Sequence, residues 1–103
     1  MMMHCVIVGT GDMAHGLAHL YSNNKSAFSG HPLEVTKPGL EKSGSFHNTG
    51  VPLGKFSEAL DRADIVILAI PPSVLKRLVY ENYPHLRNKI PVDVTNSSIP
   101  GEV

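Results

Sequence analysis

A glycine-rich segment directly follows a short apolar stretch near the N-terminus. The apolar stretch spans residues 4–8, and the segment after it is Gly9, Thr10, Gly11, Asp12, Met13 and Ala14. In this Gly-x-Gly-x-x-Ala spacing, Gly9 permits a tight turn out of a strand, and Gly11 lets the backbone approach a ligand without a Cβ in the way. Ala14 is small enough for the following helix to lie close on a sheet. Because the first N–H groups of that helix favour phosphate, the pattern predicts a dinucleotide-binding site; the alternative is an ordinary glycine turn.

Three titratable residues of this segment have structural interpretations. Asp12 stands where a phosphate would dock, and we expect its side-chain oxygen to cap the helix and its charge to favour the helix dipole. His15 and His19 are four residues apart, a spacing that could hold a metal, but no third ligand is evident. We interpret both histidines as solvated helix residues and predict no metal site.

The end of the second predicted strand, residues 33–36, should choose between the two nicotinamide coenzymes. NAD sites usually carry Asp or Glu there for the ribose hydroxyls, whereas a 2′-phosphate is held by hydroxyl and cationic groups. Here the residues are Thr36 and Lys37, and Glu34 lies too early in the strand to serve. The sequence therefore favours NADP over NAD. The alternative is that Lys37 is one more solvated surface lysine.

Two more strand ends should reach the same edge of the sheet. The longest apolar run leads to Ala69, Ile70 and Pro71, and the last predicted strand, residues 90–94, leads to Asn96. In such a sheet, ligands bind beyond the carboxyl ends of the strands. Because the nicotinamide itself carries the hydride chemistry, small and main-chain groups here suffice, and no catalytic side chain can be named. We expect Asn96 to bond near the nicotinamide ribose or carboxamide; the alternative is a turn residue.

Strand and helix patterns alternate along the chain. Strands are expected at residues 4–8, 33–36, 51–53, 64–71 and 90–94, with helices at 13–22, at 56–63 and from 72 onward. This order predicts a single α/β domain over residues 1–103: a Rossmann-like, doubly wound parallel sheet of about five strands in a three-layer α/β/α sandwich. Pro52 predicts an edge position for its short strand. Residues 37–50 are rich in turn formers where a second crossover helix is usual.

Composition and charge exclude several other classes. The 103 residues carry nine basic and nine acidic side chains, so the formal net charge of zero argues against nucleic acid or an anionic membrane as partner. The longest apolar run, residues 65–70, is too short to span a bilayer, and the first residues do not form a signal peptide. Cys5 is the only cysteine and is expected in the core. These features predict a cytoplasmic protein.

Three stretches of the chain together resemble the deazaflavin-dependent NADP oxidoreductases, a family that includes the NADPH-oxidising domain of six-transmembrane metalloreductases. The stretches are residues 9–18, 64–71 and 91–96, and the last, Pro-Val-Asp-Val-Thr-Asn, is the most specific. The resemblance implies hydride transfer between NADP(H) and a flavin, a deazaflavin or a similar acceptor. It also implies that Thr10 and Met13 line the pyrophosphate. Thr36 and Lys37 would replace the family's Ser-Arg clamp for the 2′-phosphate.

The sequence departs from that family in three ways, of which the turn-rich crossover at residues 37–50 is one. Lys37 replaces an arginine, so bidentate phosphate recognition is lost. The family's domain continues beyond its last matching strand and helps form the acceptor site, whereas this chain ends at Val103. The alternatives are therefore a NAD(P)-binding or sensing module that needs a partner or a C-terminal segment, and a scaffold that binds no nucleotide. The opening motif also resembles pyrroline-5-carboxylate reductases. An incompletely covered sheet predicts a homodimer or a larger assembly.

Overall fold

A computed structural model describes residues 2–28 and 30–94 of the chain. The elements follow one another in the order β1 (Cys5–Val8), α1 (Asp12–Asn23), the 3-10 helix η1 (Lys25–Phe28), β2 (Leu33–Thr36), β3 (Gly44–Ser45), β4 (Pro52–Leu53), α2 (Phe56–Arg62), β5 (Ile65–Leu68), α3 (Pro72–Leu86) and β6 (Ile90–Asp93). The expected α/β class is confirmed, with boundaries that differ from the predicted ones by a residue or a few.

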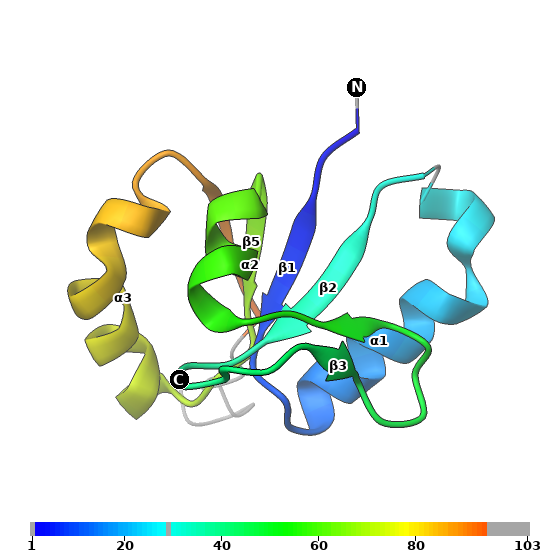
Figure 1. Ribbon diagram of the computed structural model, residues 1–103, viewed down its shortest axis with the longest axis horizontal. Helices are drawn as coiled ribbons and strands as arrows, with labels where there is room; N and C mark the ends of the chain where they lie inside the picture. The colour runs from blue at the N-terminus through cyan, green and yellow to red at the C-terminus, as the bar shows by residue number, and fades with distance from the viewer. Residues whose placement is uncertain (1, 29, 95–103) are drawn as a thin grey trace, which may run out of the picture.

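The sheet is mostly parallel, and its strand order is β3-β4-β2-β1-β5-β6. Only the β3–β4 pair is antiparallel among the described strands. The chain adds β2 on one side of β1 and β5 on the other, so the direction of winding switches beside β1. Figure 1 shows the carboxyl ends of the strands meeting along one edge, where the loops to α1 and α3 begin. A doubly wound sheet binds ligands at this switch point.

Helices cover the two faces of the sheet unequally. The side chains of β1 alternate between two apolar clusters, with Ile7 on the face packed by α1 and Val6 and Val8 on the face packed by α2 and α3. In Figure 1, α3 and α1 flank the sheet at the left and the right. Because both faces of β1 are covered, Val6, Ile7 and Val8 are fully buried. This burial explains the continuous apolar run of the strand.

Among the described residues, the α1 face of the sheet has little cover over β5 and β6. In the parallel register, Ile90 lies beside Ile65 and Val92 beside Ile67. Ile90 is 51% exposed and Val92 is 40% exposed, although both are apolar and β-branched.

Of the described helices, none is both long and apolar enough to cross a membrane.

Residues 37–53 differ from the expectation of a turn-rich loop and an edge strand. Gly44–Ser45 forms an additional strand, β3, so the sheet has six strands instead of about five. The prediction of an edge position for Pro52 is therefore wrong, because β4 lies between β3 and β2. Pro52 is tolerated since its neighbours make the bonds: Phe46 donates to the Val51 carbonyl at 2.8 Å, and Gly54 donates to the Val35 carbonyl at 2.9 Å.

The buried face of α3 is narrow. Leu78 is 3% exposed, whereas Val74 and Val79 on the same helix are 41% and 37% exposed. One prediction about a helix face needs correction. His15 was expected to be simply solvated, yet its ring lies 4.1 Å from that of Phe46, between ring centroids.

Candidate dinucleotide-binding site

The turn after β1 is fixed by close packing. Gly9 is buried with φ +132°, and a Cβ at this position would overlap the carbonyl oxygen of Ala69. Its N–H donates to the Thr36 carbonyl at 2.7 Å, while Ala69 donates to the Val8 carbonyl at 2.9 Å. The turn therefore lies directly against the ends of β2 and β5. Only glycine fits this backbone conformation and this spacing.

The N-terminus of α1 is open toward the carboxyl edge. Gly11 occupies the N-cap position with an extended backbone, and no described side chain caps the helix. A Cβ on Gly11 would meet nothing within 4 Å, so there is open space beside it. The N–H groups of the first turn and the helix dipole together favour an anion in that space.

Asp12 does not cap the helix as expected. Because Gly11 already has the extended conformation of an N-cap, Asp12 is the first helical residue, and its side chain is exposed. Its negative charge still favours the helix dipole. Ala14, by contrast, is fully buried against the sheet, as its small size predicts.

A cavity of about 350 Å³ lies beyond the ends of β1, β5 and β6. It is lined by Gly11, Asp12, Met13, Ala69, Ile70, Pro71, Pro72 and Val94. Six of these residues belong to the predicted set of site residues, and Pro72 borders the predicted strand end at Ala69, Ile70 and Pro71. Val94 was not predicted as a site residue, although it is the last residue of a predicted strand. Thr10 is half-buried in the turn between the two glycines, and Asn96 lies outside the described residues.

The two residues at the end of β2 have different environments. Thr36 is fully buried, and its hydroxyl donates to the Gly54 carbonyl at 2.7 Å. Lys37 is exposed and begins a tight turn, in which Leu40 donates to the Lys37 carbonyl at 3.1 Å. The structure therefore uses the Thr36 hydroxyl to tie β2 to the segment before α2. It leaves the Lys37 ammonium as the group that can meet a ligand.

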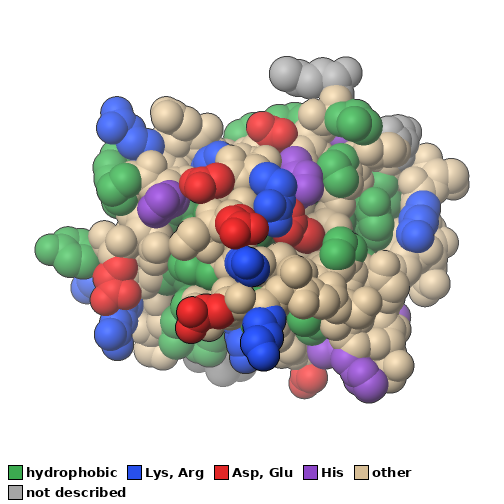
Figure 2. Space-filling model, in the orientation of Figure 1, with side chains coloured by type: hydrophobic (Ala, Val, Ile, Leu, Met, Phe, Trp, Pro, Cys, Tyr) green, Lys and Arg blue, Asp and Glu red, His purple; other side chains and the backbone are tan. Residues whose placement is uncertain are grey.

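Glu34 is the one acid in β2, and it belongs to a structural charge cluster. The residue is 5% exposed, and its carboxylate accepts hydrogen bonds from Arg62 at 2.8 and 3.0 Å and contacts the His4 ring. Burial raises the pKa of Glu34, but the hydrogen bonds and charges of Arg62 and His4 outweigh it and hold the pKa below its ordinary value. Figure 2 shows acidic and basic side chains intermingled on this side of the molecule. Glu34 in β2 is thus joined to Arg62 of α2 and to His4, the residue before β1, and does not face the candidate site.

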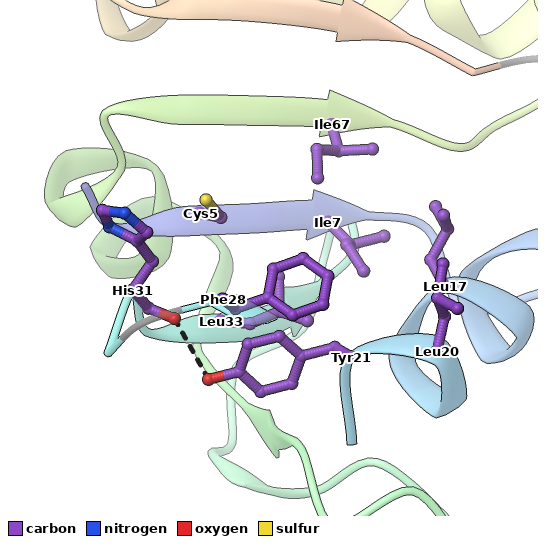
Figure 3. A pocket seen from close by; sticks show the side chains of 9 residues that line it. All are labelled: Cys5, Ile7, Leu17, Leu20, Tyr21, Phe28, His31, Leu33 and Ile67. Carbon is purple, nitrogen blue, oxygen red and sulfur yellow. Dashed lines mark hydrogen bonds between the residues drawn. The ribbon is translucent and has the colours of Figure 1, made fainter. Parts of the chain in front are cut away.

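A separate apolar cavity of about 180 Å³ lies between α1, η1 and the sheet. Figure 3 shows the rings of Tyr21 and Phe28 beside each other in it, with centroids 5.0 Å apart. The Tyr21 hydroxyl donates to the His31 carbonyl at 3.1 Å. Burial and the nearby Asp64 charge raise the pKa of the Cys5 thiol, so Cys5 stays protonated at neutral pH and is a weak nucleophile. This cavity has neither the polar groups nor the position of a nucleotide site.

The chain also matches a known family. The sequence model of the family described as "NADP oxidoreductase coenzyme F420-dependent" matches residues 4–97. This is the family that the three sequence stretches resemble. A comparison with curated proteins found no significant match.

Several solved structures share the fold. An imine reductase variant from Myxococcus stipitatus in complex with NAD+ has 24% identity and a TM-score of 0.69, over 95% of this chain and 33% of that one. A pyrroline carboxylate reductase from Plasmodium falciparum with NADP bound has 21% identity and a TM-score of 0.62, over 90% and 33%. An aspartate semialdehyde dehydrogenase II from Vibrio cholerae has 13% identity and a TM-score of 0.65, over 93% and 31%. The likeness establishes the fold, and this chain spans about a third of each of those chains.

Proposed function

The chain belongs to the family described as NADP oxidoreductase, coenzyme F420-dependent, and we propose that it binds NADP(H) at the carboxyl edge of its sheet. In this proposal the pyrophosphate lies against the turn of residues 9–14, at the N-terminus of α1. The 2′-phosphate lies at Lys37 beside Thr36, and the nicotinamide lies toward Ala69, Ile70, Pro71 and Asn96. NAD is the less favoured coenzyme, because no acid stands at the end of β2.

The observation that carries the proposal is the combination of the Gly9 turn with the open end of α1. Gly9 packs against Ala69, which brings the ends of β1 and β5 together. Gly11 leaves open space in front of the helix, and the 350 Å³ cavity begins there. A glycine that only made a turn would not require an uncapped helix facing a cavity. The arrangement is what a pyrophosphate needs.

For the reaction, we propose hydride transfer between NADP(H) and a flavin, a deazaflavin or a similar acceptor. When bound, the nicotinamide ring supplies or receives the hydride. The contribution of the chain is positional: Ile70 and Pro71 form one wall of the cavity, and Val94 forms another. These apolar residues would exclude water from the ring and orient one of its faces. We assign no catalytic residue.

Acceptor-dependent NADPH oxidation tests this reaction. The purified chain is incubated with NADPH and, in separate assays, with flavin mononucleotide, coenzyme F420 or pyrroline-5-carboxylate, and the loss of nicotinamide absorbance is followed. Oxidation with a flavin or the deazaflavin is the expected result. NADPH binding without oxidation by any acceptor would contradict the reaction and favour the alternative of a binding or sensing module. Turnover with pyrroline-5-carboxylate alone would favour a reductase of that class.

We also propose that the chain self-associates through the open sheet face. Ile90 and Val92 expose apolar surface on an edge strand, next to the half-buried Ile67. A second copy that covers this face would bury it and the strand edge together.

A cytoplasmic location, which suits a protonated free Cys5, remains our prediction; imaging of the tagged protein in cells tests it.

A further inference from the structure

A second cavity lies beside the loop after β2, at the same edge of the sheet. It has a volume of about 240 Å³ and is lined by Pro38, Val74, Arg77, Leu78, Glu81 and Asn82. Pro38 directly follows Lys37, and Val74 lies two residues after Pro72, which lines the first cavity. In Figure 1 the loop after β2 runs along the lower edge toward the start of α3. Both cavities therefore border the start of α3, and the second extends to the residue beside Lys37.

Arg77 supplies the positive charge of this second cavity. Its Nε donates to a Glu81 carboxylate oxygen at 3.1 Å, one helical turn further along α3. Helical side chains lean toward the helix N-terminus, so Arg77 stands nearer to the first cavity than Glu81 does. The ion pair with Glu81 uses the Nε atom of Arg77. The two terminal nitrogens form the outer part of the guanidinium, where a bound phosphate would accept hydrogen bonds. An arginine anchored in this way can present a fork of donors to a phosphate.

The rest of the cavity wall suits the adenosine end of a nucleotide. Pro38 and Val74 are exposed apolar residues on opposite segments, and Leu78 closes the floor with 3% exposure. A flat apolar base fits between such walls, and its ribose phosphate would then lie near Lys37. Lys37 alone is a point charge without bidentate geometry.

We propose that Arg77 binds the 2′-phosphate of NADP(H) together with Lys37 and so determines coenzyme choice; this inference rests on the proposed function. The guanidinium restores the bidentate donor that the lysine lacks. Glu81 holds the guanidinium in place and balances its charge when no phosphate is bound. The signal was invisible in the sequence, because Arg77 meets Pro38 only through the packing of α3 beside the loop after β2.

Titration of three proteins with NADPH and with NADH tests the assignment. The proteins are the wild type, Arg77→Met and the control Arg87→Met, whose arginine lines a different cavity near the end of α3. We expect Arg77→Met to weaken NADPH binding about tenfold, the effect of one lost charge-assisted contact, and to leave NADH binding unchanged. Arg87→Met should change neither. Because the Arg77 side chain is 79% exposed, the circular dichroism of the variant should match that of the wild type.

Each contrary outcome identifies what failed. If wild-type protein binds neither coenzyme, the proposed function fails before Arg77 is tested. If wild type binds NADPH but Arg77→Met loses NADPH and NADH affinity equally, the arginine contacts the shared adenosine instead, and the 2′-phosphate assignment is overturned. Unchanged binding of both coenzymes overturns it as well. Competition assays with 2′,5′-ADP and with 5′-AMP give an independent check. Arg77→Met should reduce the affinity for 2′,5′-ADP and leave the affinity for 5′-AMP unchanged.

Discussion

The turn after β1 and the end of β2 lie side by side at the carboxyl edge, yet they tolerate change very differently. At the turn, Gly9 is buried, has a positive φ, and leaves no space for a Cβ against Ala69. At the end of β2, Lys37 is exposed, and Arg77 across from the same loop is exposed too. A backbone hydrogen bond from Gly9 to the Thr36 carbonyl joins the two regions.

The contrast separates what builds the site from what selects its ligand. Gly9, at the start of the turn that would receive the pyrophosphate, is part of the core packing, so the chain cannot change it and still fold well. The groups that would bind the 2′-phosphate are exposed surface cations that contribute little to the folding free energy. Coenzyme preference could therefore shift by exchange of a few exposed residues while the fold stays the same.

Gly9→Ala should have the largest effect. The methyl group would overlap the Ala69 carbonyl, and alanine is strained at φ +132°, so we expect the free energy of unfolding to fall by about 3 kcal/mol. The Gly9→Ala variant should also lose NADPH binding. Urea denaturation followed by circular dichroism measures the first effect and calorimetric titration the second. A variant as stable as the wild type would refute the packing argument.

Gly11→Ala is the matched control for that variant. Gly11 has φ −85° and open space around it, so the fold should tolerate a methyl group there with little change in stability. Coenzyme binding should nevertheless weaken, because the methyl group intrudes where the pyrophosphate approaches. Unchanged affinity for NADPH would show that Gly11 does not lie against the bound coenzyme.

Glu34, inside β2, tests whether a buried residue of this strand affects stability without affecting coenzyme choice. Glu34→Gln should lower the free energy of unfolding by about 2 kcal/mol, because it breaks the buried contacts with Arg62 and His4, and should leave coenzyme choice unchanged. Urea denaturation and titration with both coenzymes measure the two effects. A shift toward NADPH would mean that Glu34 takes part in ribose recognition.

The same carboxylate predicts a pH dependence. Since the pKa of Glu34 is lower in the folded chain than in the unfolded one, the unfolded chain takes up the proton first as the pH falls. The stabilisation is complete above about pH 5 and is lost as the pH falls below the ordinary glutamate pKa of about 4.3. Denaturation midpoints across this range should fall more steeply for the wild type than for Glu34→Gln. Parallel curves would contradict the cluster's role.

Lys37→Ala tests the selective side of the comparison. We expect NADPH affinity to fall by about 1.4 kcal/mol, roughly tenfold, with NADH affinity and stability unchanged, because the lysine is exposed and meets only the 2′-phosphate. Lys25→Ala, in η1, is the matched control. An equal loss for both coenzymes would place Lys37 at a group that they share.

Val92→Glu should have the smallest effect on the isolated fold. Val92 is 40% exposed on an edge strand, so a charge there should leave the free energy of unfolding nearly unchanged while it weakens self-association. Sedimentation at micromolar concentration compares the two proteins. A wild type that is already monomeric would refute the proposed self-association.

The sequence predicted those parts of the molecule that local spacing determines. The turn at residues 9–14, the apolar runs of β1 and β5 and the helix after each are set by neighbouring residues. The strand at Gly44–Ser45 was missed, because two small polar residues carry no alternating pattern. The Thr36 hydroxyl bond to Gly54 and the cavity beside Arg77 depend on segments distant in the sequence, so only the folded chain shows them.

The most direct test of the account is calorimetric titration of the purified chain with NADPH, NADH and NADP+ in parallel. The account predicts saturable NADPH binding in the micromolar range, weakened at least about tenfold for NADH, a difference of about 1.4 kcal/mol. Absence of heat and of thermal stabilisation with every nucleotide would contradict it. The glycine turn would then serve the fold alone.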